Sequence, residues 1–280
     1  MKKLGFIDYY LDEWHANNYF PWIKEGAQEL NEEFEVCYAY GEIDSPIGGI
    51  SSEEWCKKNN VELCKTIEEI CEKSDYLFIL APSNPERHLD LAKKVLPYGK
   101  TTYIDKTFAY NLEEAKEIYK IANQYGTKIF SSSALRFADE WTGYEKVDSL
   151  LAFGTGGSFY EYSVHIIEIT VRLMGIGADS ITVISSDKFN TVVKVDYKDG
   201  RSVVINYSNA WMPYAVCVVD KGEVKYLSAD SHYFKNLLKS ILKFFLTGEA
   251  PFDYNQTLEV MAIRDACLKG IENVGETIKI

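Results

Sequence analysis

Short apolar runs alternate with helical patterns along the first 130 residues. Runs at 4–7, 34–40, 75–82, 101–105 and 128–133 predict strands, and the amphipathic segments between them predict helices. The run DYLFILAP at 75–82 is apolar almost throughout, which is typical of a strand buried on both faces of a parallel sheet. This alternation indicates βαβ units and therefore a doubly wound parallel sheet.

Polar residues at the expected helix starts agree with this pattern. Thr66 with a glutamate three positions later forms a capping box, and Asn111 has a glutamate at the same spacing. Asn84 followed by Pro85 has the form of an N-cap and a first helical position. Helices are therefore expected to begin near residues 67, 85 and 112.

The pattern changes after residue 150. Five consecutive strands are expected between 180 and 228, with an Asp199-Gly200 turn signal between two of them. Consecutive strands without intervening helices indicate an antiparallel sheet, and two helical patterns follow at about 232–247 and 255–272. We therefore expect an α/β first domain over 1–130 and a shortened α+β domain over 131–280, with the C-terminal helix packing back toward the first domain.

Composition narrows the class of protein. The chain has 42 acidic and 30 basic residues, and this charge of −12 opposes binding to nucleic acid or anionic lipid. No apolar run is long enough to span a membrane, and Asp8 interrupts the first apolar run too early for a signal peptide. The six cysteines form no C-x-x-C pair, so reduced thiols, no metal site and a cytoplasmic location are expected.

The stretch YIDKTFAYN at 103–111 carries the first candidate chemistry. Asp105 and Lys106 follow an expected strand directly, and ligands of open parallel sheets bind at the carboxyl ends of the strands. Lys106 is therefore either a group that contacts a ligand or a solvated loop charge.

Several segments, taken in order, resemble the Gfo/Idh/MocA family of NAD(P)-dependent oxidoreductases. YIDKTFAYN and the residues up to ALRF are similar to the family segment that runs from a Glu-Lys-Pro motif to an Arg-Phe pair. LAPSNPERHLDLAKK is similar to its cofactor-side loop, and GGSFYEYSVHIIEITVRLMG to its Gly-Gly and Asp-x-x-x-His pattern. The resemblance covers most of the chain from about residue 75 and implies a Rossmann-like dinucleotide-binding domain followed by a substrate and oligomerisation domain.

The resemblance also implies site residues. Lys106 matches the lysine that holds the substrate hydroxyl, His165 the general base, and Glu161 the carboxylate four residues before it. On a helix, positions i and i+4 share a face, and a carboxylate beside an imidazole raises its basicity. The cofactor-side residues are Pro82, Ser83, Asn84, His88 and Asp105. The implied ligands are NAD or NADP and a sugar, cyclitol or related polyol, and a homo-oligomer is expected.

The resemblance is weakest at the first turn. A G-x-G-x-x-G turn should follow GFI, but DYYLDEWH stands there, with Asp8 at the first glycine and further carboxylates at Asp12 and Glu13. A carboxylate about 4 Å from a phosphate charge costs on the order of 4 kcal/mol at an effective dielectric constant of about 20. Weak dinucleotide binding is therefore predicted unless the turn directs these carboxylates outward.

Three interpretations remain open at this point. The first is an NAD(P)-dependent polyol oxidoreductase, the second a degenerate member that binds or senses a small molecule without a nucleotide, and the third a non-redox enzyme that uses His165 and Glu161. The alternative to a catalytic role for His165 is that of a hydrogen-bonded histidine in the core, and His15 is expected to be structural. Glu168, on the same predicted helix as His165, is expected at the surface.

Overall fold

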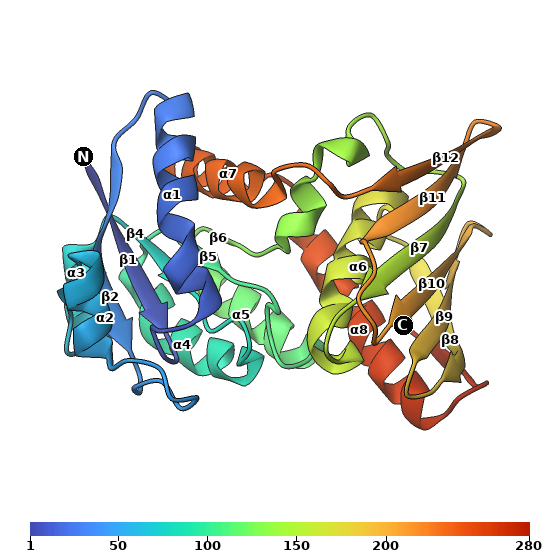
Figure 1. The fold of residues 1–280 in the computed structure, drawn as a ribbon, viewed down its shortest axis with the longest axis horizontal. Helices are drawn as coiled ribbons and strands as arrows, with labels where there is room; N and C mark the ends of the chain where they lie inside the picture. Colours follow the sequence, from blue (N-terminus) through green and yellow to red (C-terminus); the bar gives the residue numbers. More distant parts are fainter. The chain divides into compact units, whose positions relative to one another are not determined.

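A computed structural model describes residues 1–280 as two compact units (Figure 1). The first unit comprises Met1–Ser132 and Phe234–Phe252, and the second comprises Ser133–Tyr233 and Asp253–Ile280. The expected division at 130/131 differs from this in one main respect. The segment of the first closing helix groups with the first unit, whereas the C-terminal helix groups with the second.

The first unit is built on a parallel sheet, as predicted. Its six strands have the order β3-β2-β1-β4-β5-β6, and every pair is parallel. The strands are β1 (Lys2–Asp8), β2 (Phe34–Gly41), β3 (Glu62–Leu63), β4 (Tyr76–Ile79), β5 (Thr102–Ile104) and β6 (Ile129–Phe130). The middle strands are almost wholly buried, which explains their continuous apolar sequence.

Helices connect these strands. They are α1 (Trp14–Glu29), α2 (Ser52–Asn59), α3 (Ile67–Lys73), α4 (His88–Val95) and α5 (Leu112–Tyr125), with short 3₁₀ turns at Pro85–Arg87 and Leu96–Tyr98. Thr66 and Asn111 cap α3 and α5 through their side chains, as predicted. Asn84 makes no side-chain cap, because Pro85 starts the 3₁₀ turn and the α-helix begins only at His88.

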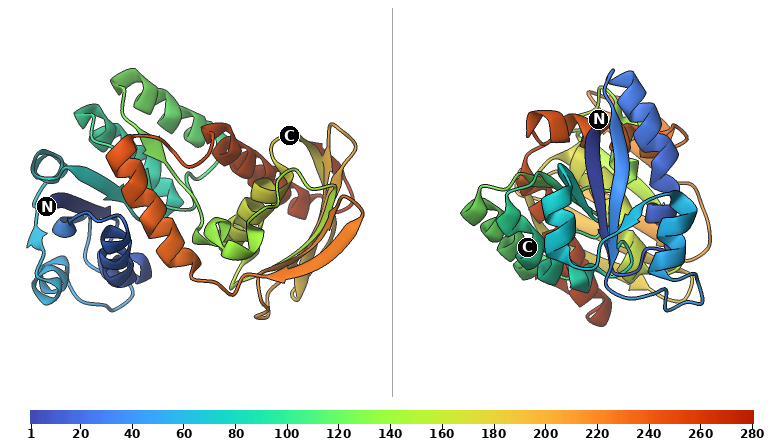
Figure 2. Two further views of the ribbon diagram at one scale, coloured as in Figure 1. Left: turned by 90° about the horizontal axis from the view of Figure 1, so that it is seen from above. Right: turned by 90° about the vertical axis from the view of Figure 1, so that its left-hand side faces the viewer.

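Helix α7 (Tyr233–Thr247) completes the first unit beside α1 (Figures 1 and 2). Lys239 and Lys235 both pair with Glu29 of α1, at 2.6 and 2.7 Å. The Phe234 and Trp22 rings stack at 4.9 Å. Interactions across more than 200 residues of sequence therefore place α7 here, and no local pattern predicts them.

The second unit contains a seven-stranded sheet of order β12-β11-β7-β10-β9-β8-β13. Its strands are β7 (Ser149–Thr155), β8 (Ala178–Ser186), β9 (Asn190–Tyr197), β10 (Ser202–Ser208), β11 (Ala215–Asp220), β12 (Glu223–Ser228) and β13 (Thr277–Lys279). The expected antiparallel character is confirmed, except that β7 and β10 pair in parallel. The edge strand β13 and the inner strand β7 had not been predicted.

Helices α6 (Phe159–Met174) and α8 (Tyr254–Glu272) pack against one face of this sheet. Gly154 of β7 allows the close approach of α6, because a Cβ atom at this position would lie 2.8 Å from Cβ of Ile166. The turn at Gly200, with φ of +90°, closes the β9–β10 hairpin as predicted. Short 3₁₀ turns at Ala134–Phe137 and Asp139–Trp141 precede β7. No helix of either unit has the length and apolar character needed to cross a bilayer.

Candidate active site

Lys106 and Asp105 lie at the carboxyl end of β5, where the parallel sheet presents its loops. The Lys106 ammonium is nearly buried and donates to the carbonyl oxygen of Pro82, in the loop after β4, at 3.0 Å. Ser83 is exposed and Asn84 half-buried in the loop that follows Pro82. The fold therefore places the predicted lysine and the predicted cofactor-side loop together at one edge of the sheet.

His88 joins the two loops at this edge. Its Nε2 lies 2.6 Å from the carbonyl oxygen of Leu80 and its Nδ1 lies 3.1 Å from that of Phe108. Its side chain has no exposed surface, and this burial lowers its pKa. His88 therefore holds the chain segments after β4 and β5 together, and it offers no exposed atom for the predicted contact with a cofactor.

Asp105 is the centre of a buried hydrogen-bond network. One carboxylate oxygen accepts from the backbone N–H of Lys106 at 2.8 Å and from the Tyr103 hydroxyl at 3.3 Å. The other contacts Nδ1 of His15 and accepts from the Tyr19 hydroxyl at 3.3 Å. Burial by itself raises the pKa of Asp105, but the His15 imidazole and the Lys106 charge outweigh it and hold that pKa below its usual value.

Sequence reasoning had not connected His15 to Asp105, 90 residues away. The i, i+4 spacing of His15 and Tyr19 places both rings on one face of α1, and their rings stack with centroids 5.0 Å apart. This spacing is the only local signal of the network. The Asp105 carboxylate comes within reach of His15 only because β5 lies next to β4, and β4 next to β1, in the folded sheet.

The acidic β1–α1 turn directs its carboxylates in two directions. Asp12 is half-buried and accepts from the Asn17 amide and from the backbone N–H of Ile50, both at 2.9 Å. Asp8 and Glu13 instead turn inward, with exposed fractions of 1% and 8%. Glu13 caps α1, since its side chain accepts from two backbone N–H groups of the first turn.

Asp8 is the less satisfied of the two buried carboxylates. Its Oδ1 accepts from the backbone N–H of Ala81 at 3.0 Å, whereas its Oδ2 is buried without a hydrogen-bond partner. Burial, followed by the charge of Glu13, raises the pKa of Asp8 well above its usual value. Burial also raises the pKa of Glu13.

These residues do not fit the pyrophosphate of a dinucleotide. Such a group needs a close approach of backbone N–H groups at a glycine-rich turn and helix N-terminus, with positive or neutral surroundings. Here the turn has no glycine and contains two buried carboxylates, and the N–H groups of His15 and Ala16 in the first turn of α1 donate to Glu13. Asp8 and Glu13 turn inward, whereas Asp12 bonds to Asn17 and Ile50, so the predicted weak binding of a dinucleotide stays a prediction that rests on Asp8 and Glu13.

Asp8→Asn should stabilise the protein at alkaline pH. Asparagine can still accept from Ala81, and it removes a carboxylate whose pKa is raised in the folded state. A raised carboxyl pKa contributes stability below the unfolded pKa of about 3.9, and this contribution is lost as pH rises through the folded value. We expect a gain of about 1–3 kcal/mol at pH 8 that disappears near pH 4, measured by urea unfolding across pH.

Asp105→Asn is the matched control, for which the expected change in stability at pH 8 has the opposite sign. The lowered pKa of Asp105 contributes stability above the unfolded pKa, and this contribution is lost only as pH falls through the folded value. This variant should therefore lose stability at pH 8 and differ little from the parent in acid. If Asp8→Asn changed the free energy of unfolding by the same amount at every pH, the raised pKa of Asp8 in the folded state would be contradicted.

In the second unit, α6 carries Glu161 and His165 one turn apart. The Ser158 hydroxyl caps the helix by accepting from the backbone N–H of Glu161 at 3.3 Å. His165 is half-buried, and its Nδ1 lies 2.7 Å from the Ser133 hydroxyl. The Tyr214 ring meets the imidazole edge-on at 5.8 Å. Ser133, which sequence reasoning had missed, thus orients the predicted base.

Glu168 is buried, so its expected surface position is wrong. It is 3% exposed and pairs with Arg136, itself 4% exposed, at 3.0 Å. Arg136 also donates to the amide oxygen of Gln256. The other Glu168 oxygen accepts from the backbone N–H of Ser133 at 3.3 Å. The ion pair therefore supports the serine that orients His165.

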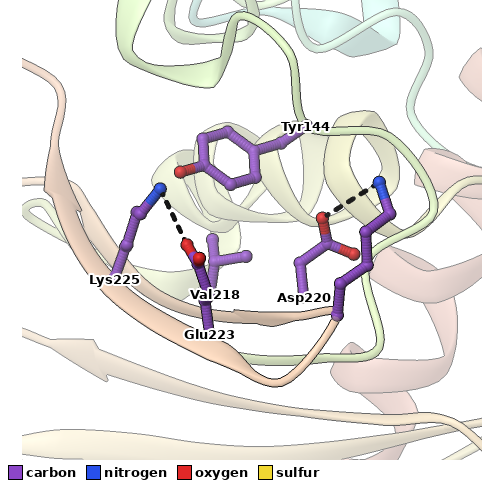
Figure 3. Close-up of a pocket in the computed structure, with 6 residues that line it drawn as sticks. Tyr144, Val218, Asp220, Glu223 and Lys225 are labelled. Carbon is purple, nitrogen blue, oxygen red and sulfur yellow. Dashed lines mark ion pairs between the residues drawn. The ribbon is translucent and has the colours of Figure 1, made fainter.

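A separate hollow of about 210 Å³ lies at the β11–β12 hairpin (Figure 3). Its carboxylates pair with lysines of the same hairpin, Glu223 with Lys225 at 3.2 Å and Asp220 with Lys221 at 3.8 Å. Its six lining residues include none of the predicted site residues. In neither unit do three or more His, Cys, Asp or Glu side chains form a group that could hold a metal ion.

Comparison with known proteins adds the family. Residues 47–133 match the Gfo/Idh/MocA family model, described as an oxidoreductase family with an NAD-binding Rossmann fold. The match includes Asp105 and Lys106 and begins after the acidic turn. A search of curated protein sequences finds no match.

Solved structures of similar fold cover nearly the whole chain. A putative myo-inositol dehydrogenase from Sinorhizobium meliloti has a TM-score of 0.77 and 14% identity, with 100% of both chains covered. A scyllo-inositol dehydrogenase from Lactobacillus casei with bound NAD(H) and scyllo-inositol has a TM-score of 0.77 and 12% identity, with 99% of this chain and 98% of that chain covered. These likenesses confirm the two-part fold.

Together, the family match and the fold confirm the predicted resemblance to the Gfo/Idh/MocA family. Residues 47–133 are thus similar in sequence to an oxidoreductase family with an NAD-binding Rossmann fold, and the whole chain is similar in fold to inositol dehydrogenases. Lys106 lies in the first unit, and Glu161 and His165 lie in the second. Their predicted convergence on one site stays a prediction.

Proposed function

We propose that the protein is an oxidoreductase that acts on a sugar, cyclitol or related polyol, with Lys106 and His165 as its substrate-handling groups. The observation that carries this proposal is the position of Lys106, at the carboxyl end of β5 and inside the segment that matches the family model. Inositol dehydrogenases among the structures of similar fold support the substrate class.

The two side chains have complementary chemistry. The Lys106 ammonium supplies positive charge and hydrogen-bond donors for a substrate oxygen that becomes more negative during the reaction. His165 has one ring nitrogen engaged with Ser133, so the ring is held in a defined orientation for proton transfer. Glu161, one turn earlier on α6, is the proposed carboxylate partner of this base.

A second function is favoured by the β1–α1 turn. The buried carboxylates Asp8 and Glu13 occupy the region where a family member would hold a pyrophosphate. A degenerate member that binds or senses a polyol without a nucleotide would show this arrangement. In the oxidoreductase proposal, by contrast, NAD or NADP binds despite the turn, with its nicotinamide end near Pro82, Ser83 and Asp105.

We also propose a cytoplasmic homo-oligomer that assembles through the second unit's sheet. Its strands expose apolar side chains, among them Leu151 at 39%, Ile184 at 52% and Tyr226 at 62%. Large apolar side chains exposed together are typical of an interaction site. Light scattering coupled to gel filtration would measure the mass of the particle.

Calorimetric titration with NADH and NADPH separates the two functions. The oxidoreductase proposal predicts weak binding, with a Kd on the order of hundreds of micromolar, and polyol-dependent formation of the reduced nicotinamide at saturating nucleotide. Saturable polyol binding with no nucleotide binding and no turnover would support the degenerate module and contradict the oxidoreductase.

A further inference from the structure

Glu13 occupies the N-terminus of α1, the position at which a parallel α/β sheet most readily binds an anion. Helix N-termini present unpaired N–H groups and a positive dipole end, and both attract phosphate. In this chain the Glu13 carboxylate accepts from the backbone N–H of His15 at 2.7 Å and from that of Ala16. The backbone carbonyl of Glu13 accepts from Asn17 at 3.0 Å. Three N–H groups in the first turn of the 16-residue helix, those of His15, Ala16 and Asn17, therefore already have partners.

The Glu13 side chain caps α1 from a buried position and not from the protein surface. Its side chain is 8% exposed, and it lies among buried groups rather than in solvent. Leu11, 1% exposed, fills the turn before it. A glycine-rich turn would leave this space to the ligand, whereas here the protein fills it.

Asp8 gives a second observation at the same turn. It ends β1, is 99% buried, and has an oxygen without any hydrogen-bond partner. An entering phosphate would bring negative charge toward this carboxylate as well as toward Glu13. The negative charge of these carboxylates and the space that the turn occupies thus both oppose the binding of a phosphate.

We infer that the Glu13 carboxylate takes the place of a ligand phosphate, so that a dinucleotide binds this unit only by displacing Glu13 from the α1 N-terminus. The inference rests on the proposed function only for the class of ligand. Displacement must break two hydrogen bonds from backbone N–H groups to a carboxylate and move that carboxylate out of a buried position. The Glu13 carboxylate therefore lowers the affinity of this site for every ligand that would place a phosphate there.

The test uses ADP, which carries the phosphates without the nicotinamide, and NADH as a second probe. The full chain is titrated as the parent, as Glu13→Ser and as Asp12→Ser. Serine keeps a hydroxyl that can cap α1 but removes the charge and most of the volume. We expect Glu13→Ser to bind ADP at least about tenfold more tightly than the parent, and Asp12→Ser to stay within about twofold, because Asp12 bonds to Asn17 and Ile50 instead.

Two results would overturn the inference. One is low-micromolar binding of ADP and NADH by the parent, and the other is no gain in a folded Glu13→Ser protein. If Glu13→Ser does not fold, Glu13→Gln is titrated with ADP in its place. This variant keeps the size of the side chain and an acceptor oxygen and removes only the charge. A gain in ADP affinity without any polyol turnover would leave this inference standing and contradict the proposed oxidoreductase.

Discussion

Arg136→Met is expected to lower the free energy of unfolding by about 3–5 kcal/mol. The substitution keeps the length of the side chain but leaves Glu168 buried and charged without its ion-pair partner. Removing one member of a buried pair costs far more than removing both, because an isolated charge cannot regain its hydration in the interior. Urea unfolding followed by circular dichroism measures the effect.

The double variant Arg136→Met with Glu168→Leu provides the control. Both charges are then absent, and we expect at least half of the lost stability to return, with a coupling free energy of about 2 kcal/mol or more. Additive losses would show that the two side chains do not stabilise each other. Because Glu168 also accepts from the backbone N–H of Ser133, Glu168→Leu alone should disturb the orientation of His165.

His165→Gln and Lys106→Met are expected to lower kcat by about 10²–10⁴-fold each with the polyol substrate. Glutamine can still bond to the Ser133 hydroxyl but cannot exchange a proton, so the loss should appear in kcat more than in KM. Methionine removes the positive charge of Lys106 and its bond to Pro82 while keeping the length of the side chain. Steady-state kinetics and melting temperatures measured together separate catalysis from folding.

Ser133→Ala is the matched control for His165. It removes the hydroxyl that holds Nδ1 but leaves the imidazole in place. We expect a loss of about tenfold, smaller than that of His165→Gln, and a changed pH profile of kcat. If His165→Gln retained full activity while remaining folded, His165 would be a packing residue and the proposed chemistry would be wrong.

The structure also changes which residue of the acidic turn matters most. In the sequence, Asp8, Asp12 and Glu13 are equivalent carboxylates in a turn that lacks glycine. The tertiary structure separates them, because Asp12 finds partners at Asn17 and Ile50 whereas Glu13 finds the N–H groups of α1. A variant at Asp12 is therefore the control, and a variant at Glu13 is the test.

Sequence by itself determined the parallel sheet of the first unit, because apolar runs such as 75–82 and side-chain caps such as Thr66 and Asn111 are local signals. It also determined the succession of strands after 178 and placed Lys106 at a strand end. These features depend on periodicity and on contacts within a few residues, which one chain displays directly.

Only the tertiary structure decided which distant groups meet. The pairs His15 with Asp105 and Arg136 with Glu168 join residues 90 and 32 positions apart, and α7 reaches α1 across about 200 positions. Glu168 looked like a surface residue because a carboxylate on a helix is usually solvated, and a buried partner overrides that preference. Such pairings depend on how strands and helices pack, and a single sequence carries no periodic signal for them.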